Sequence, residues 1–273
     1  MHGSNGEWGH LTLGEGGKVQ PKIVDVWTDS ESSPNVVVLI PTEILPIILA
    51  PTIHVWSRAG LDQPTFDRLM EAVPLDPSRK KYMLHVISCQ DTLPLLVSYL
   101  ESKGGKVTFE HGHPFRTFLS HNTNPKDPIW TPEIPDGFYI DSLTLDDIQL
   151  VNETWPYNRG KETLGRLQYW IERFPSSALR DSAGNLKGNC LVADWGGFVH
   201  LYVDPSLRGQ SFATKLLLDV GRKVLEAGWG IPAYCQVSHE NIASGRANNK
   251  AGLMDVNFDV TYAIYDPPPR NQS

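Results

Sequence analysis

The chain has 273 residues, a formal net charge of -7 and a hydrophobic share of 40%. Its length suffices for two domains of ordinary size or for one large one. There is no basic run, which argues against nucleic acid as the main partner. No apolar run is long enough to span a membrane, because two prolines and a glutamate interrupt the longest one, at 36–50.

The cysteines and the N-terminus predict the compartment. Cys89, Cys190 and Cys235 have neither metal-like nor paired spacing, which is typical of proteins in a reducing compartment. Residues 1–20 are polar and rich in glycine, with neither a secretory apolar core nor an arginine-rich targeting segment. We therefore expect a disordered segment at 1–20 and a monomeric protein in the cytoplasm.

Residues 21–119 predict a first domain in which strands and helices are mixed. Helices are expected at 64–72 and 91–102, and the second of them should end at Gly104. Short apolar or alternating runs predict strands at 23–27, 36–40, 53–56, 83–87 and 106–110. Such a mixture is typical of an α/β or α+β domain built on an open sheet.

Four histidines of this domain raise the question of a metal site. His111 and His113 would lie on the same face of a strand, as ligands can, and His54 and His85 lie in predicted strands. However, no cysteine or acidic residue stands near them at a ligand-like spacing. We therefore expect packed or solvated histidines and no bound metal.

A proline-rich stretch at 120–136 is expected to link two domains. Its four prolines exclude a helix or a central strand and favour an extended, fairly stiff chain. A second domain is then predicted at 137–273. Its expected strands are 138–141, 178–180, 186–194, 198–203, 232–237 and 256–265, and its expected helices are 144–155, 162–173, 211–227 and 241–251.

The turn at 208–213, between the predicted strand at 198–203 and the long helix, carries the most specific chemistry. It consists of Arg208, Gly209, Gln210, Ser211, Phe212 and Ala213. A helix N-terminus presents unpaired N–H groups and partial positive charge, and small residues let a pyrophosphate approach them closely. Arg208 adds a fixed cation. These features favour a nucleotide diphosphate, although an ordinary strand–helix turn fits the spacing equally well.

The run V-D-P-S-L-R-G-Q-S-F-A at 203–213 resembles the acyl-CoA motif of the GNAT acetyltransferase superfamily, Arg/Gln-x-x-Gly-x-Gly/Ala. Arg208 and Ala213 occupy the outer places, and Ser211 stands where a glycine is usual. The order of predicted elements in the second domain is also similar to the GNAT fold. In that family the turn binds the pyrophosphate of coenzyme A, and the preceding strand splays from its neighbour to hold the pantetheine arm.

Over roughly 21–265 the sequence more narrowly resembles the glycine N-acyltransferase family. The similar segments include 24–27, 35–38, 55–57, 137–143, 150–155 and 169–175. The resemblance implies a tandem GNAT-like fold with a degenerate first domain and a second domain that binds acyl-CoA. It also implies transfer of an acyl group to the amine of glycine or another small amino acid. Relatives in that family often act in mitochondria, although no targeting signal is visible in this sequence.

The resemblance also implies roles for individual residues. The acyl-CoA substrate would contact Tyr202, Val203, Arg208, Gly209, Gln210, Ser211, Phe212, Ala213, Thr214, Asn241 and Ser244. A backbone N–H, at Tyr202 or more specifically Val203, would stabilise the developing oxyanion. The amine would attack the thioester directly in a ternary complex, with a general base near neutral pKa to help it.

Two positions depart from the family pattern. The family's glutamate base is replaced at Gly197 and Phe198, and Asn248 stands where many GNAT enzymes have a tyrosine acid. His200 is the nearest alternative base, although we favour the interpretation that it is a packed or hydrogen-bonded histidine of the sheet. Asp194 and Glu240 are weaker candidates. A protein that binds acyl-CoA as a sensor or regulatory partner, with little turnover, is therefore a second hypothesis.

Aromatic residues on the two helices before the second domain's central strands leave a further question open. Trp155, Tyr169 and Trp170 could line the acceptor or acyl cavity, or they could belong to the core, since helical spacing of aromatics fits both roles.

Overall fold

The computed structural model describes residues 24–28, 33–41, 52–73, 75, 81–87, 89–109, 114–158 and 160–268. The expected disordered segment at 1–20 and the histidines at 111 and 113 lie outside this range. The chain forms two compact units. Described residues up to Phe115, together with those from Phe258 onward, form unit 1, and residues 116–257 form the body of unit 2.

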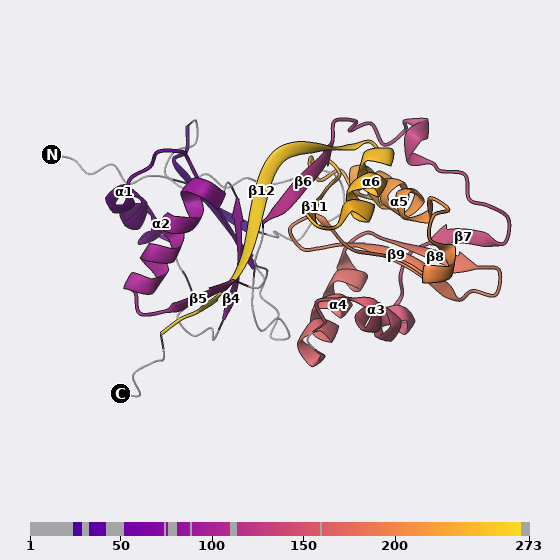
Figure 1. Cartoon of the computed structure of the whole chain (residues 1–273), viewed down its shortest axis with the longest axis horizontal. Helices are drawn as coiled ribbons and strands as arrows, with labels where there is room; N and C mark the ends of the chain where they lie inside the picture. The colour runs from indigo at the N-terminus through magenta and orange to yellow at the C-terminus, as the bar shows by residue number, and fades with distance from the viewer. Residues whose placement is uncertain are drawn as a thin grey trace. The chain divides into compact units, whose positions relative to one another are not determined.

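Unit 1 is a sheet with two helices (Figure 1). Its strands follow the order β1-β2-β3-β4-β12, and β5 also pairs with β12. The β3–β4 pair is parallel, whereas the pairs β1–β2, β2–β3, β4–β12 and β5–β12 are antiparallel. The elements are β1 (Val24–Thr28), β2 (Val36–Pro41), β3 (Thr52–Ser57), α1 (Gln63–Met70), β4 (Tyr82–Ile87), α2 (Cys89–Ser102), β5 (Lys106–Phe109) and β12 (Leu253–Asp266).

Alternation along the strands and helical spacing in α1 and α2 build the core of unit 1. Phe66 and Met70 of α1, one helical turn apart, are almost fully buried, as are Leu96 and Leu100 of α2. They pack in one cluster with strand residues such as Val38, Ile53, Val55, Leu84 and Val86.

Unit 2 has a sheet with helices on both faces. Its strand order is β6-β11-β10-β9-β8-β7, and β10 and β11 pair in parallel. Figure 1 shows α3 and α4 on one face of β8 and β9, and α5 and α6 on the other. The elements are β6 (Phe115–Ser120), η1 (Pro128–Trp130), β7 (Phe138–Asp141), η2 (Leu145–Asp147), α3 (Ile148–Thr154), α4 (Lys161–Arg173), β8 (Ser176–Asp181), β9 (Leu186–Val192), β10 (Phe198–Val203), η3 (Pro205–Leu207), α5 (Phe212–Glu226), β11 (Tyr234–Ser238) and α6 (Ile242–Lys250).

The predicted fold class, a mixed α/β fold with a mixed, mostly antiparallel sheet flanked by helices, is confirmed. Each predicted strand and helix has a counterpart, with ends that differ by at most three residues once η2 is counted with α3. The N-terminal part of the helix expected at 144–155 is a separate 3-10 turn, η2. The sequence did not predict β6, which precedes the expected linker.

The observed partition differs from the predicted boundaries in two places. The stretch at 120–136 belongs to unit 2 and packs there, because the Trp130 side chain is only 1% exposed and lies against Gly221 of α5. Residues from Phe258 onward belong to unit 1, because β12 pairs with β4 and β5 of that unit. Strand pairing is a long-range interaction, so position in the sequence does not determine the unit to which a strand belongs.

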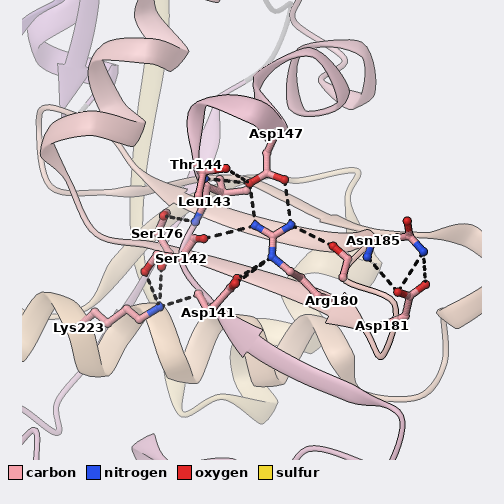
Figure 2. Close-up of polar contacts among 11 residues, drawn as sticks. Asp141, Ser142, Leu143, Thr144, Asp147, Ser176, Arg180, Asp181, Asn185 and Lys223 are labelled. Carbon is pink, nitrogen blue, oxygen red and sulfur yellow. Dashed lines mark hydrogen bonds and ion pairs between the residues drawn. The ribbon is translucent and has the colours of Figure 1, made fainter.

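A buried arginine ties the first helical turns of unit 2 to the sheet (Figure 2). Arg180 of β8 makes two parallel hydrogen bonds to Asp147 of η2, at 2.9 and 2.8 Å, and a further pair to Asp141 of β7. The guanidinium and the Thr144 N–H hold the pKa of Asp147 below its ordinary value, although burial alone would raise it. This network fixes the start of α3 against β8.

Candidate functional site

The turn between β10 and α5 has a backbone that few side chains would tolerate. Gly209 has a φ of +82° and Ser211 a φ of +64°, so both lie in the left-handed region. A Cβ on Gly209 would meet nothing within 4 Å, which leaves open space beside its backbone. Glycine fits this conformation without strain, and a small serine occupies the position directly before α5.

The start of α5 leaves a row of backbone donors free. Among the residues that the structure describes, no acceptor is found for the N–H groups of residues 209–214. Ser211 caps α5 in position, but its side chain makes no capping hydrogen bond. The Lys215 N–H is the first of the helix to be paired, at 3.1 Å to the Ser211 carbonyl. Six successive N–H groups at the positive end of a 15-residue helix make a strong site for an anion.

The side chains of the turn show which of them are available to a ligand. Arg208 is exposed, and its Nε donates to the Val203 carbonyl at 3.2 Å, which keeps the guanidinium beside the turn. Gln210 is exposed. Phe212 is 1% exposed and packs against Phe138, so its side chain anchors the helix in the core and only its N–H faces the turn.

Helix α6 lies beside the first turn of α5. Thr214 Oγ1 donates to the Ala247 carbonyl at 3.4 Å, which links the two helices. The Asn241 side chain accepts from the Ser244 N–H at 3.1 Å and caps α6. The structure therefore brings Asn241 and Ser244 to the helix that packs on the turn, although each already has a partner within α6.

Asn248 has the contacts of a structural residue. It is 1% exposed, its amide oxygen accepts from the Cys235 thiol at 3.0 Å, and its amide nitrogen donates to the Ser244 carbonyl at 2.9 Å. Burial raises the pKa of Cys235 to about 12, so this thiol stays protonated and keeps donating. An amide also has no proton to give a leaving thiolate near neutral pH.

Strands β10 and β11 are paired only at their beginnings. The single matched pair is Phe198 with Cys235, although β10 continues to Val203 and β11 to Ser238. Beyond Phe198 the edge of β10 that faces β11 is therefore not closed by a strand ladder. The edge left open in this way includes the backbone N–H of Val203, directly before the turn.

His200 is held on both sides of its ring. Its Nε2 lies 2.7 Å from the Val151 carbonyl of α3, and its Nδ1 lies 2.8 Å from the Asn189 side-chain nitrogen of β9. A carbonyl can only accept, so Nε2 carries the proton and Nδ1 accepts from Asn189. Burial lowers the pKa of His200 below its ordinary value. The lone pair that a general base would need is therefore occupied in this conformation.

The carboxylates weighed as bases differ in environment. Asp194 lies in the turn between β9 and β10, where its Oδ1 accepts from the Trp170 indole at 3.0 Å and burial raises its pKa. Glu240 is exposed. A desolvated carboxyl with a raised pKa is the better proton acceptor of the two at neutral pH.

Two of the three aromatic residues in question belong to the core. Tyr169 and Trp170 are 8% and 1% exposed. Trp155 is half-buried and contacts both Trp170 and the His200 ring, with centroid distances of 5.7 and 5.4 Å. Trp155 thus covers the bulged part of β10.

Asn189 is the residue of this site that sequence reasoning missed. It is fully buried in β9, and its side chain contacts both the ring and the carbonyl of His200. The signal was an asparagine inside the apolar segment Leu186–Val192, because a buried polar side chain requires a partner. The sequence did not show that the partner was eleven positions away.

In unit 1, His54 and His85 face each other across β3 and β4, with their Nδ1 atoms 2.5 Å apart. Tyr262 of β12 stacks on His85. No group of three possible metal ligands occurs among the described residues. No helix in the described parts of the chain has the length and apolar character to cross a membrane.

No family model matches the chain. Among solved structures, a Drosophila protein from a structural genomics programme is similar over 85% of this chain and 74% of its own, with a TM-score of 0.63 and 19% identity. A GCN5-related N-acetyltransferase from Kribbella flavida is similar over 86% of this chain and 88% of its own, with a TM-score of 0.50 and 10% identity. A tandem GNAT protein from the clavulanic acid biosynthesis pathway is similar over 91% of this chain and 84% of its own, with a TM-score of 0.48 and 16% identity. At such identities the likeness is one of fold, and the chain therefore has the fold of a GCN5-related N-acetyltransferase.

Proposed function

We propose that the chain binds acyl-CoA at the turn 208–214 and transfers its acyl group to an amine. The six free N–H groups at the start of α5 are the observation that carries the proposal, because they match the charge and size of a pyrophosphate. Arg208 adds a cation at the same place, and the opening between β10 and β11 leads away from it. The shared fold with an N-acetyltransferase supports the same interpretation.

The chain's backbone supplies a donor for the reaction as well as for binding. The Asp204 N–H bonds to the Lys187 carbonyl on β9, and N–H groups alternate along a strand, so the Val203 N–H points to the opposite edge. There it would donate to the thioester carbonyl oxygen as negative charge develops. The amine nitrogen forms a bond to the carbonyl carbon, the C–S bond breaks, and the thiolate of coenzyme A leaves. The amine loses one proton in the process.

The acceptor we propose is glycine or another small amino acid, on the family resemblance of the sequence. Asp194 is the described carboxyl whose environment best suits it to take the amine proton, directly or through water. An amine that is already neutral could react without it.

A sensor that binds acyl-CoA with little turnover is a second candidate. The observation that favours it is that the side-chain polar atoms of His200 and Asn248 are already hydrogen-bonded to partners inside the protein. Neither residue is poised to accept or donate a proton.

Calorimetry with coenzyme A and acetyl-CoA tests the binding step. Gly209→Ala should weaken binding about tenfold, because a side chain at φ +82° forces the turn to move. Gly228→Ala is the matched control: Gly228 follows the other end of α5, has a φ of +70°, and also has open space around its Cβ position. Equal affinity of both variants, or no binding by the folded wild type, contradicts the proposal.

Release of the coenzyme A thiol separates enzyme from sensor. Acetyl-, benzoyl- and longer acyl-CoAs would be incubated with a panel of amino acids, with glycine included, and thiol release compared with that in the absence of an amine. Amine-dependent release supports the transferase. Tight binding without release under any pairing supports the sensor.

A further inference from the structure

Along β10, the set of residues whose backbone polar groups face β9 changes at one point. Before it, the Gly197 carbonyl bonds to the Ala193 N–H, so odd-numbered residues direct their polar groups toward the β9 side. After it, the Asp204 N–H bonds to the Lys187 carbonyl, so even-numbered residues do so. The alternation of backbone polar groups between the two edges of β10 is therefore inverted within the strand.

A one-residue bulge causes the inversion. Phe198 and Val199 pair with Val192 and Leu191, but Tyr202 pairs with Asn189, so two residues of β10 stand opposite one residue of β9. An extra residue exchanges the two edges for every position that follows. Without the bulge, the Val203 N–H would face β9. With it, this N–H faces the open edge beside β11.

His200 lies in the bulge with a φ of +53°, a conformation that costs energy for a residue with a Cβ. Three hydrogen bonds hold it there. Asn189 Nδ2 lies 2.8 Å from the His200 carbonyl and 2.8 Å from its Nδ1, and His200 Nε2 lies 2.7 Å from the Val151 carbonyl. Trp155 covers the ring. One side chain from β9 and one carbonyl from α3 thus fix both the backbone and the ring.

We infer that Asn189 and His200 are positioning residues that lock the β10 bulge and so direct the Val203 N–H toward the acyl carbonyl. The inference rests on the proposed function for its catalytic consequence, but the lock itself is a property of the fold. In this inference His200 positions the backbone of β10 and does not transfer a proton. The buried Asn189 supplies the hydrogen bonds that hold His200 in the bulge.

Amide hydrogen exchange tests the lock without any ligand. In the wild type the Asp204 amide should exchange slowly and the Val203 amide quickly, because only the first is paired with β9. In Asn189→Ala and His200→Ala the difference should shrink at least about tenfold, since the bulge loses hydrogen bonds that hold it and can slip. Alanine at 200 removes the ring and its two hydrogen bonds but keeps the cost of the positive φ, so the bulge is no longer held. The exposed His121, replaced in His121→Ala, is the control.

Kinetics test the consequence. With acetyl-CoA and the amine that supports turnover, both variants should lose about 10- to 100-fold in kcat, while the dissociation constant of coenzyme A changes less than about threefold. Ring nitrogen NMR at pH 7.5 should show a neutral His200 with its proton on Nε2.

The outcomes are distinguishable. If the wild type neither binds coenzyme A nor releases its thiol, the proposed function fails, and amide exchange alone still decides the lock. If both variants keep the wild-type exchange pattern, or keep kcat in an active protein, the inference is overturned. A proton on Nδ1 of His200 would also overturn it.

Discussion

Helix α1 of unit 1 and helix α5 of unit 2 differ at their N-termini. In unit 1, the Asp62 side chain accepts from the Thr65 N–H at 2.8 Å, and a proline occupies the first turn of α1. A fixed negative charge therefore satisfies that helix from within the chain. In unit 2, no side chain caps α5, and its first donors are left free. The comparison shows that an anion site needs backbone donors that no side chain of the protein already satisfies, and the start of α5 has such donors.

The units also treat charge differently, and this gives the largest expected effect. Arg180→Met should lower the free energy of unfolding by about 3 kcal/mol, because it leaves two carboxylates without their buried partner. In unit 1, the exposed Lys103–Glu71 pair should contribute little, so Glu71→Gln should leave the free energy of unfolding nearly unchanged. Urea unfolding of both variants measures this. Equal losses would contradict the contrast.

Copying the α1 cap onto α5 should abolish most binding. Ser211→Asp places a carboxylate at the start of α5, which satisfies its donors and repels a pyrophosphate, so coenzyme A affinity should fall about 100-fold. Stability should stay equal or rise. Calorimetry and thermal unfolding on the same sample would show the two changes, and a parallel loss of both would mean that the variant simply misfolds.

Buried histidines should make stability depend on pH. Burial lowers the pKa of His54 to about 3 and that of His85 well below its ordinary value. Protons then bind the unfolded chain first, so this stabilisation is complete above pH 6.5 and is lost progressively as the pH falls toward 3. The expected loss is about 1 kcal/mol per histidine between pH 6.5 and 5.5.

The slope of unfolding free energy against pH measures this effect. His54→Gln should reduce the slope, because one of the two buried rings no longer titrates. An unchanged slope would show that other groups cause it.

Removing the α1 cap should have a small effect on stability and none on binding. Asp62→Ala should lower the free energy of unfolding slightly, because the Thr65 N–H loses its side-chain acceptor. Coenzyme A binding should be unchanged, since the α1 cap lies in unit 1. A loss of affinity would mean that the contrast between the two helix ends is not the origin of the site.

Local patterns were sufficient for much of the molecule. Helical spacing predicted α2 and α5, and apolar runs predicted β3, β4 and β10, because these signals depend on neighbours within one element. The segment β6 escaped prediction, because its polar neighbours and the prolines that follow resemble a linker. The packing of Trp130 against Gly221 depends on a contact between distant segments, and no local pattern reports it.

The sequence by itself determined the kinds of element, their order and the small residues of the turn at 208–213, since each follows from short-range propensity. Only the tertiary structure decided the partners of β12, the bulge in β10 and the pairing of His200 with Asn189 and Val151. These depend on which strands meet and in which register. A buried polar side chain in a strand requires a hydrogen-bond partner, but the tertiary structure determines which residue that partner is.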